Sequence, residues 1–243
     1  MNRLVFRKLP QLSYPVNEAF NTLSTNVSFL GRDIKKIMIT SSQASEGKSF
    51  TSITLCRKLA ERGKRVVLVD TDLRRSRITT VYGVQFAPGS KKQGLSHYLA
   101  GIAEKEEVLF NTNIPGMDFI PMGHELLNPI PLLSSERFQN LLDGLAEQYD
   151  YVIVDAAPVG VVIDAAEIAK ACDGILLVVS YNQVHRQELI DVKNQLEQTG
   201  CPILGTILNQ VEYEGFANKK YYYKSHYSSY YKAYEKEAEE KKS

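Results

Sequence analysis

Hydrophobic residues recur along the chain at two spacings, and each spacing predicts a different element of secondary structure. The first segment of helical spacing has apolar residues three or four positions apart, namely Val16, Phe20, Leu23, Val27 and Leu30. Such residues share one face of an amphipathic helix. Pro15 suits a first helical turn and Gly31 suits a helix end, so we expect a helix over residues 15–31.

Further segments also have helical character. We expect them at 48–62, 95–99, 138–149, 165–171 and 187–199. Ser134 and Ser135 are candidate caps for the helix that begins near 138. Gly200 and Pro202 form a stop signal for the last helix.

Short continuous apolar runs alternate with these helices. They occur at 37–40, 66–69, 117–120, 151–154, 175–179 and 203–208. Runs without a polar face are typical of strands that are buried on both faces of a parallel sheet. The alternation of strand and helix therefore predicts an α/β domain whose mostly parallel sheet carries helices on both faces.

The pattern ends near residue 211. Beyond it, tyrosines alternate with lysines and serines and no apolar stripe accompanies them. Eight of the fourteen tyrosines fall in the last 31 residues, although unfolded segments are normally poor in aromatic residues. We therefore predict a folded domain over 1–211 and a mobile, tyrosine-rich tail over 212–243.

Composition excludes several classes of function. Lys plus Arg (29) nearly balances Asp plus Glu (28), so we expect no nucleic-acid partner. The apolar runs are too short for a membrane span, so we expect no direct membrane insertion. The three cysteines form no C-x-x-C pair and no secretory signal opens the sequence, which favours a cytoplasmic protein. The four histidines show no metal-binding spacing, and we expect them on the surface or in loops.

One segment has the context of a Walker A loop, because it follows a predicted strand and opens a predicted helix. Its members, which we expect to bind nucleotide, are Ser42, Gln43, Ala44, Ser45, Glu46, Gly47, Lys48 and Ser49. Lys48 would reach the β- and γ-phosphates, and the Ser49 hydroxyl would ligate Mg²⁺. Ser42 stands where the usual pattern has its first glycine.

Three acids follow predicted strands. Asp70 and Asp72 come directly after the run 66–69, and Asp155 follows the run 151–154. Parallel strands end at one edge of a sheet, where such folds bind ligands, and Mg²⁺ prefers oxygen ligands. We expect Asp72 and Asp155 to hold the metal, and Asp70 to accept a proton from an attacking hydroxyl.

Three further polar residues are candidates for the site. Asn209 follows the last predicted strand, where related P-loop proteins contact adenine, and we expect it to bind nucleotide. Asp164 either caps the helix at 165–171 or supports the metal ligands from behind. Arg74 either contacts phosphate or meets a neighbouring subunit.

The order of these motifs resembles that of bacterial tyrosine kinases of the capsule and exopolysaccharide type. The resemblance rests on the Walker A loop, on D-x-D-x-R from Asp70 to Arg74, on Asp155 in a Walker B position and on the tyrosine cluster. It implies a P-loop NTPase-type fold, ATP and Mg²⁺ as cofactors, and Lys48, Asp70, Asp72 and Asp155 as catalytic residues. It also implies γ-phosphate transfer to tail tyrosines of a neighbouring copy. The expected acceptors are Tyr221, Tyr222, Tyr223, Tyr227, Tyr230, Tyr231 and Tyr234.

The resemblance further implies partners. Members of this length depend on a membrane-anchored activator, a chain-length regulator, which would recruit the chain to the inner face of the cell membrane. A cognate tyrosine phosphatase and a homo-oligomer with phosphorylation between copies are also implied. The family's N-terminal E-x-x-R-x-x-R motif is matched at Glu18, but Asn21 and Ser24 replace its arginines, which leaves the number of subunits open.

Two other functions compete with this one. A partitioning or septum-placement ATPase of the same superfamily would carry a lysine at the position of Gln43 and would lack a tyrosine-rich tail. A nonenzymatic adhesive or nucleic-acid-stacking role for the tail conflicts with the neutral charge and the catalytic acids.

Overall fold

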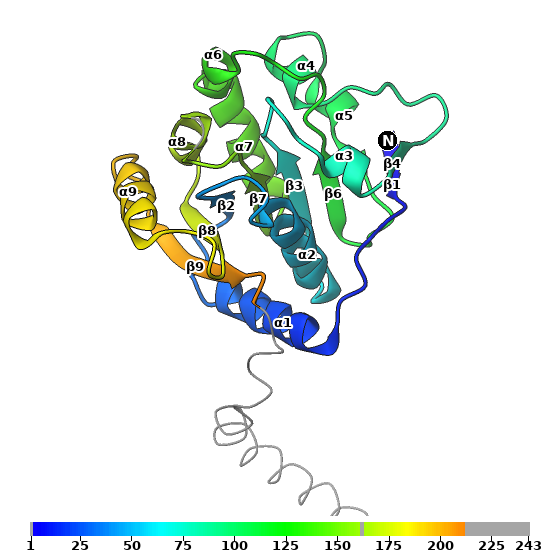
Figure 1. Ribbon diagram of the computed structural model, residues 1–243. Helices are drawn as coiled ribbons and strands as arrows, with labels where there is room; N and C mark the ends of the chain where they lie inside the picture. The colour runs from blue at the N-terminus through cyan, green and yellow to red at the C-terminus, as the bar shows by residue number, and fades with distance from the viewer. Residues whose placement is uncertain (1, 161–162, 212–243) are drawn as a thin grey trace, which may run out of the picture. The chain divides into compact units, whose positions relative to one another are not determined.

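A nine-stranded sheet forms the centre of the protein in the computed structural model, which describes residues 2–160 and 163–211. Its strand order is β4-β1-β5-β6-β3-β7-β2-β8-β9 (Figure 1). Neighbouring strands in the run β3-β7-β2-β8-β9 pair in parallel. The pairs β3–β6 and β1–β5 are also parallel. The pairs β1–β4 and β5–β6 are antiparallel. The predicted mostly parallel α/β fold is therefore confirmed.

The predicted strands all form. They are β2 (Lys36–Ser41), β3 (Val66–Asp70), β6 (Met117–Ile120), β7 (Tyr151–Asp155), β8 (Gly174–Ser180) and β9 (Ile203–Asn209). Every residue of β3, β7 and β8 is buried, as continuous apolar runs predict. The register places Asp70 directly beside Asp155, so two of the predicted acids end neighbouring strands.

Helices cover both faces of the sheet. The longer ones are α1 (Tyr14–Ser28), α2 (Lys48–Glu61), α7 (Glu136–Gln148), α8 (Asp164–Ala169) and α9 (Arg186–Glu197), with the short α4 (Leu95–Leu99) beside them. All six were predicted, and the Ser135 side chain caps α7 by accepting a hydrogen bond from the Phe138 amide.

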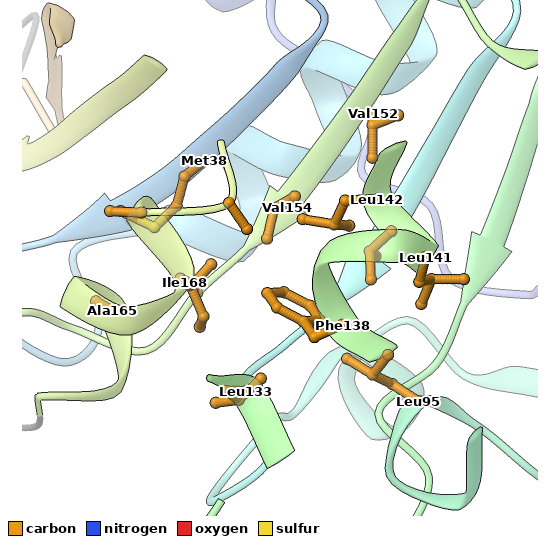
Figure 2. Packing of buried hydrophobic residues seen from close by; sticks show 14 of the residues in the cluster. Met38, Leu95, Leu133, Phe138, Leu141, Leu142, Val152, Val154, Ala165 and Ile168 are labelled. Carbon is orange, nitrogen blue, oxygen red and sulfur yellow. The ribbon is translucent and has the colours of Figure 1, made fainter. Parts of the chain in front are cut away.

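Alternation along β2 shows how the faces divide. Met38 belongs to the hydrophobic cluster that α7, α8 and α9 cover, whereas Ile37 and Ile39 belong to the cluster with α1 and α2. Neighbouring residues of a strand point to opposite faces, so each strand supplies both cores. Figure 2 shows the first cluster, where the side chains of Phe138 of α7, Val154 of β7 and Ile168 of α8 gather.

Several small elements were not predicted. They are β1 (Asn2–Phe6), β4 (Val84–Phe86), β5 (Phe110–Asn111), α3 (Ile78–Val81), α5 (Lys105–Val108) and α6 (Ile130–Leu133). The three strands extend the sheet beyond β6. They are short or mix polar with apolar residues, so neither period is long enough in the sequence to be recognised.

The C-terminal segment is a separate unit. The chain divides into Met1–Asn209 and Gln210–Ser243, and the predicted tail, 212–243, lies outside the described residues. The domain boundary at 211 stays a prediction. Among the residues that the structure describes, no helix has the length and apolar character to cross a membrane.

His97 differs from the expectation of a surface or loop position. It lies on α4 with 8% of its surface exposed, and its Nδ1 accepts a hydrogen bond of 3.1 Å from the Gly94 amide. The ring of His124 lies 4.6 Å away, centre to centre. Burial and the charge of His124 both lower the pKa of His97.

We predict that His97 makes the protein acid-sensitive. A lowered folded pKa keeps the imidazole neutral, so its contribution to stability is complete above about pH 6.5, the usual histidine pKa, and is lost as the pH falls below it. His97→Asn keeps an acceptor but cannot titrate. Urea unfolding at pH 7.5 and 5.5 should therefore show that the free energy of unfolding falls less between these pH values in the variant than in the wild type. The exposed His185, changed to Gln, should keep the wild-type loss, and equal losses in the wild type and His97→Asn would contradict the prediction.

Candidate nucleotide and phosphoryl-transfer site

The predicted phosphate loop lies between β2 and α2. Gly47 caps α2 with a left-handed backbone (φ 92°), and Ser45 also has a positive φ of 68°. A Cβ atom at Gly47 would lie 2.1 Å from the side-chain nitrogen of Asn209, which would have to move, and the positive φ itself favours glycine. The loop therefore opens a helix whose N-terminus favours anions.

Lys48, the first residue of α2, contacts the acids at the ends of the strands. Its ammonium lies 3.1 Å from an Asp72 oxygen and 4.0 Å from an Asp155 oxygen. Burial opposes its charge, but Asp155 and Asp72 outweigh burial and raise the pKa of Lys48. The lysine is therefore cationic at neutral pH, as a phosphate-binding lysine must be.

Two serines hold Asp155. The Ser49 hydroxyl donates to one carboxylate oxygen at 2.7 Å, and the Ser52 hydroxyl donates to the other at 2.8 Å. Asp155 is fully buried, and burial raises its pKa, while Lys48 and the two serines oppose that rise. The carboxylate is thus fixed in position by the first turns of α2.

Asp70 is the most strongly perturbed acid of the site. It is fully buried; one carboxylate oxygen accepts the Ser76 hydroxyl, and the other accepts no hydrogen bond from the residues that the structure describes. Burial, and then the charge of Asp155, hold the pKa of Asp70 well above its usual range. A carboxylate with a raised pKa is a stronger base than an exposed one.

Hydrogen bonds within the loop and to other elements hold its residues from Ser42 to Glu46 in place. The Ser42 hydroxyl and the Gln43 amide both donate to the Glu46 carboxylate. The Gln43 side chain donates to Glu188 of α9 at 2.6 Å, and the Asn209 side chain donates to the Glu46 carbonyl at 2.8 Å. Asn209 therefore lies against the loop; its contact with adenine stays a prediction.

Arg74 forms a bidentate ion pair with Asp164. The two bonds measure 2.6 and 3.0 Å, and Arg74 also donates to the Leu127 carbonyl. Of the two interpretations of Asp164, the cap of α8 was wrong, because the cap residue is Ile163 and the buried Asp164 carboxylate pairs with Arg74; support of the metal ligands stays a prediction. The pair joins the segment after β3 to the start of α8.

The donor set suits Mg²⁺. Ser49, Asp72 and Asp155 offer oxygen atoms only, and Mg²⁺ is usually held by one or two carboxylates together with substrate phosphates and waters. In the described part of the chain, no three or more His, Cys, Asp and Glu side chains are arranged to hold a metal ion by themselves. A cation at this site would therefore depend on phosphate oxygens.

Comparison with known proteins agrees with this geometry. Residues 34–200 match the family described as "AAA domain". The chain is 39% identical over 194 residues to the tyrosine-protein kinase CpsD of Streptococcus agalactiae. This match covers 80% of this chain and 82% of that protein. The chain belongs to the bacterial tyrosine-protein kinases. The resemblance expected from the motifs is confirmed, and the protein is a tyrosine kinase.

Solved structures separate this kinase from its wider superfamily. The kinase domain of the Escherichia coli tyrosine kinase ETK is 34% identical, with a TM-score of 0.75 over 81% of this chain and 76% of that one. The septum site-determining protein MinD of Pyrococcus horikoshii, solved with Mg-ADP, is 24% identical with a TM-score of 0.60 over 72% and 70%. The second likeness shows a shared P-loop fold alone.

Three site residues of the kinase were missed in the sequence. Ser52 and Ser76 hold Asp155 and Asp70, and the Ser180 amide at the end of β8 donates to Glu46. Ser52 could have been found, because residues three apart on a helix lie on one face and Ser49 was already assigned. Nothing in the spacing of Ser76 or Ser180 signals their contacts.

We predict that Ser52→Ala destabilises the kinase by about 1–3 kcal/mol without nucleotide, because it leaves a buried carboxylate oxygen without its donor. Urea unfolding measures this change. Ser28→Ala is a control for the helical bond alone: the exposed Ser28 hydroxyl donates to the carbonyl one turn earlier, whereas the one proton of the buried Ser52 hydroxyl is shared between that carbonyl and Asp155. Equal losses in the two variants would mean that the contact with Asp155 adds no stability.

Proposed function

We propose that this kinase transfers the γ-phosphate of ATP to the tyrosines between 221 and 234 of a neighbouring copy, and thereby regulates capsule or exopolysaccharide synthesis. The observation that carries the proposal is the fully buried carboxylate of Asp70, which lies beside Asp155 of the Lys48–Asp72–Asp155 cluster and has a raised pKa. A tyrosine hydroxyl with a pKa near 10 is a weak nucleophile unless a base accepts its proton. A hydrolase acting on water needs no such tyrosine-rich segment.

Each residue of the site has a proposed role. Lys48 binds the β- and γ-phosphates, and the amides of the loop from Ser42 to Ser49 support them. Ser49, Asp72 and Asp155 hold Mg²⁺, which neutralises charge on the transferring phosphoryl group when it is bound. Asp70 accepts the phenol proton, and Asn209 contacts the adenine.

Partners follow from the family. We propose a cytoplasmic kinase that a membrane-anchored activator recruits to the inner face of the membrane, with a cognate phosphatase that reverses its reaction. Phosphorylation between copies favours an oligomer, because a nearby tail raises the local concentration of acceptor hydroxyls. Asn21 donates its side-chain amide to Glu18 within α1, so this helix differs from the family's arginine-bearing motif.

The rival septum-placement ATPase has less support. Its loop lysine is replaced by Gln43, whose side chain donates to Glu188 of the same chain. The likeness to MinD lies below 25% identity, whereas the kinases named above reach 34% and 39%.

Labelled ATP tests the proposed acceptors. Incubated with Mg²⁺ and a fragment of the activator, the wild type should incorporate label between Tyr221 and Tyr234, as mapped by mass spectrometry. A variant with Phe at the seven proposed acceptors should lose this label while it still binds nucleotide, because only the acceptor hydroxyls are removed. Lys48→Met should lose the label although its acceptor tyrosines are intact, since the residue that binds the phosphates is gone.

The ATPase alternative predicts a different result. Steady release of phosphate with no label on the tail would overturn the proposed reaction. Label confined to Tyr213 or to residues of the folded domain would overturn the choice of acceptors, although the kinase assignment would stand.

A further inference from the structure

A buried acid lies within the loop that we expect to hold the negatively charged phosphates. Glu46 has 2% of its surface exposed. Its carboxylate accepts three hydrogen bonds: from the Ser42 hydroxyl at 2.7 Å, from the Gln43 amide at 2.6 Å and from the Ser180 amide at 2.9 Å. Burying a charge is costly unless hydrogen bonds compensate it, so these three donors explain how the chain tolerates an acid here.

The three bonds connect parts of the site that are distant in the sequence. One oxygen of Glu46 holds Ser42 and Gln43 at the start of the loop, and the other holds Ser180 at the end of β8. The Glu46 carbonyl in turn accepts the side chain of Asn209, the last residue of β9. Glu46 therefore fastens the beginning of the loop to its end, and both to the edge of the sheet.

The backbone around Glu46 requires such fastening. Ser45 and Gly47, its two neighbours, have φ values of 68° and 92°. A left-handed conformation is strained at a serine and persists only where its surroundings impose it. Successive amides in alternating conformations form concave anion sites, so the strain belongs to the same loop shape that would hold phosphate.

Ser42 gains a role from this contact. It stands where the usual pattern has glycine, and its hydroxyl donates to Glu46 in a fully buried position. Ser42, which replaces the usual glycine, and the buried Glu46 therefore form a hydrogen-bonded pair.

We propose that Glu46 is a positioning residue that fixes the phosphate loop in its nucleotide-binding shape before ATP arrives, and that Ser42 is its partner. The inference rests on the proposed function in one respect, namely that nucleotide binds at this loop. Glu46 touches no reacting group in this proposal and acts through the backbone that it holds.

Nucleotide affinity tests the pair. Titration of the full chain with fluorescent ADP in the presence of Mg²⁺ gives a dissociation constant for the wild type, Glu46→Gln, Ser42→Ala and the double variant. A glutamine has one acceptor oxygen, so it can satisfy the Gln43 amide or the Ser180 amide but not both. Glu46→Gln should weaken binding about tenfold, which corresponds to about 1.4 kcal/mol. Ser42→Ala should weaken it less, and the double variant should lose less than the sum.

Glu188→Gln is the matched control. It makes the same chemical change and also contacts the loop, through the Gln43 side chain on the exposed side, so it should bind ADP as the wild type does. For steady-state turnover, a positioning role predicts that Glu46→Gln and Ser42→Ala raise KM for ATP while kcat at saturation changes little.

Several results would overturn the inference. Wild-type affinity in Glu46→Gln would do so, as would strictly additive losses for Ser42 and Glu46. If Glu46→Gln does not fold, Ser42→Ala alone carries the test: a fall in kcat that parallels a fall in its urea midpoint, with KM unchanged, would show a merely structural role. A wild type that binds no ADP would instead overturn the proposed function.

Discussion

The pairing of β7 with β3 on one side and β2 on the other is the constraint on which the site depends, because it brings like charges together in a buried place. Asp70 and Asp155 lie side by side in the register, and Asp72 follows two residues later. The charge of Asp155 raises the pKa of Asp70, and Lys48 reaches both Asp72 and Asp155. A triphosphate adds more negative charge to this edge. A nucleotide and a divalent cation should therefore bind together, since the acids that repel the phosphates are the oxygen ligands that a hard cation prefers.

This constraint explains why the centre of the fold was predictable. In the central strands, every residue is buried on one face or the other, so their sequences must be continuous apolar runs, as Val66–Val69 and Tyr151–Val154 are. An acid that directly follows such a run lies at the ligand-binding edge. The position of the predicted phosphate loop could also be read from the sequence, because Gly47, Lys48 and Ser49 stand between a recognisable strand and a recognisable helix.

The edge strands and the contacts that support the site were harder to predict from the sequence. β1 and β4 pair with each other at the edge of the sheet, where polar residues are tolerated and the apolar period is broken. Ser76, after β3, and Ser180, at the end of β8, contact Asp70 and Glu46, and no periodicity encodes these contacts. The structure pairs Arg74 with Asp164, 90 residues away, a contact that the sequence did not indicate; the expected contact with phosphate or a neighbouring subunit stays a prediction. Contacts between distant loops depend on how the strands are ordered, and hydrophobic spacing does not determine that order.

Fold alone cannot separate a kinase from a hydrolase in this superfamily, because MinD shares the fold at 24% identity. The distinction must lie in groups that handle the acceptor. Water can approach from many directions, whereas a tyrosine needs a base fixed at one point, and a base buried among other acids is stronger than an exposed one. Asp70 meets both conditions, because Ser76 holds one of its oxygens and burial raises its pKa. Burial, together with the repulsion among three carboxylates at one edge of the sheet, thus raises the pKa of Asp70, and this raised pKa is what would allow the site to accept a proton from a phenol.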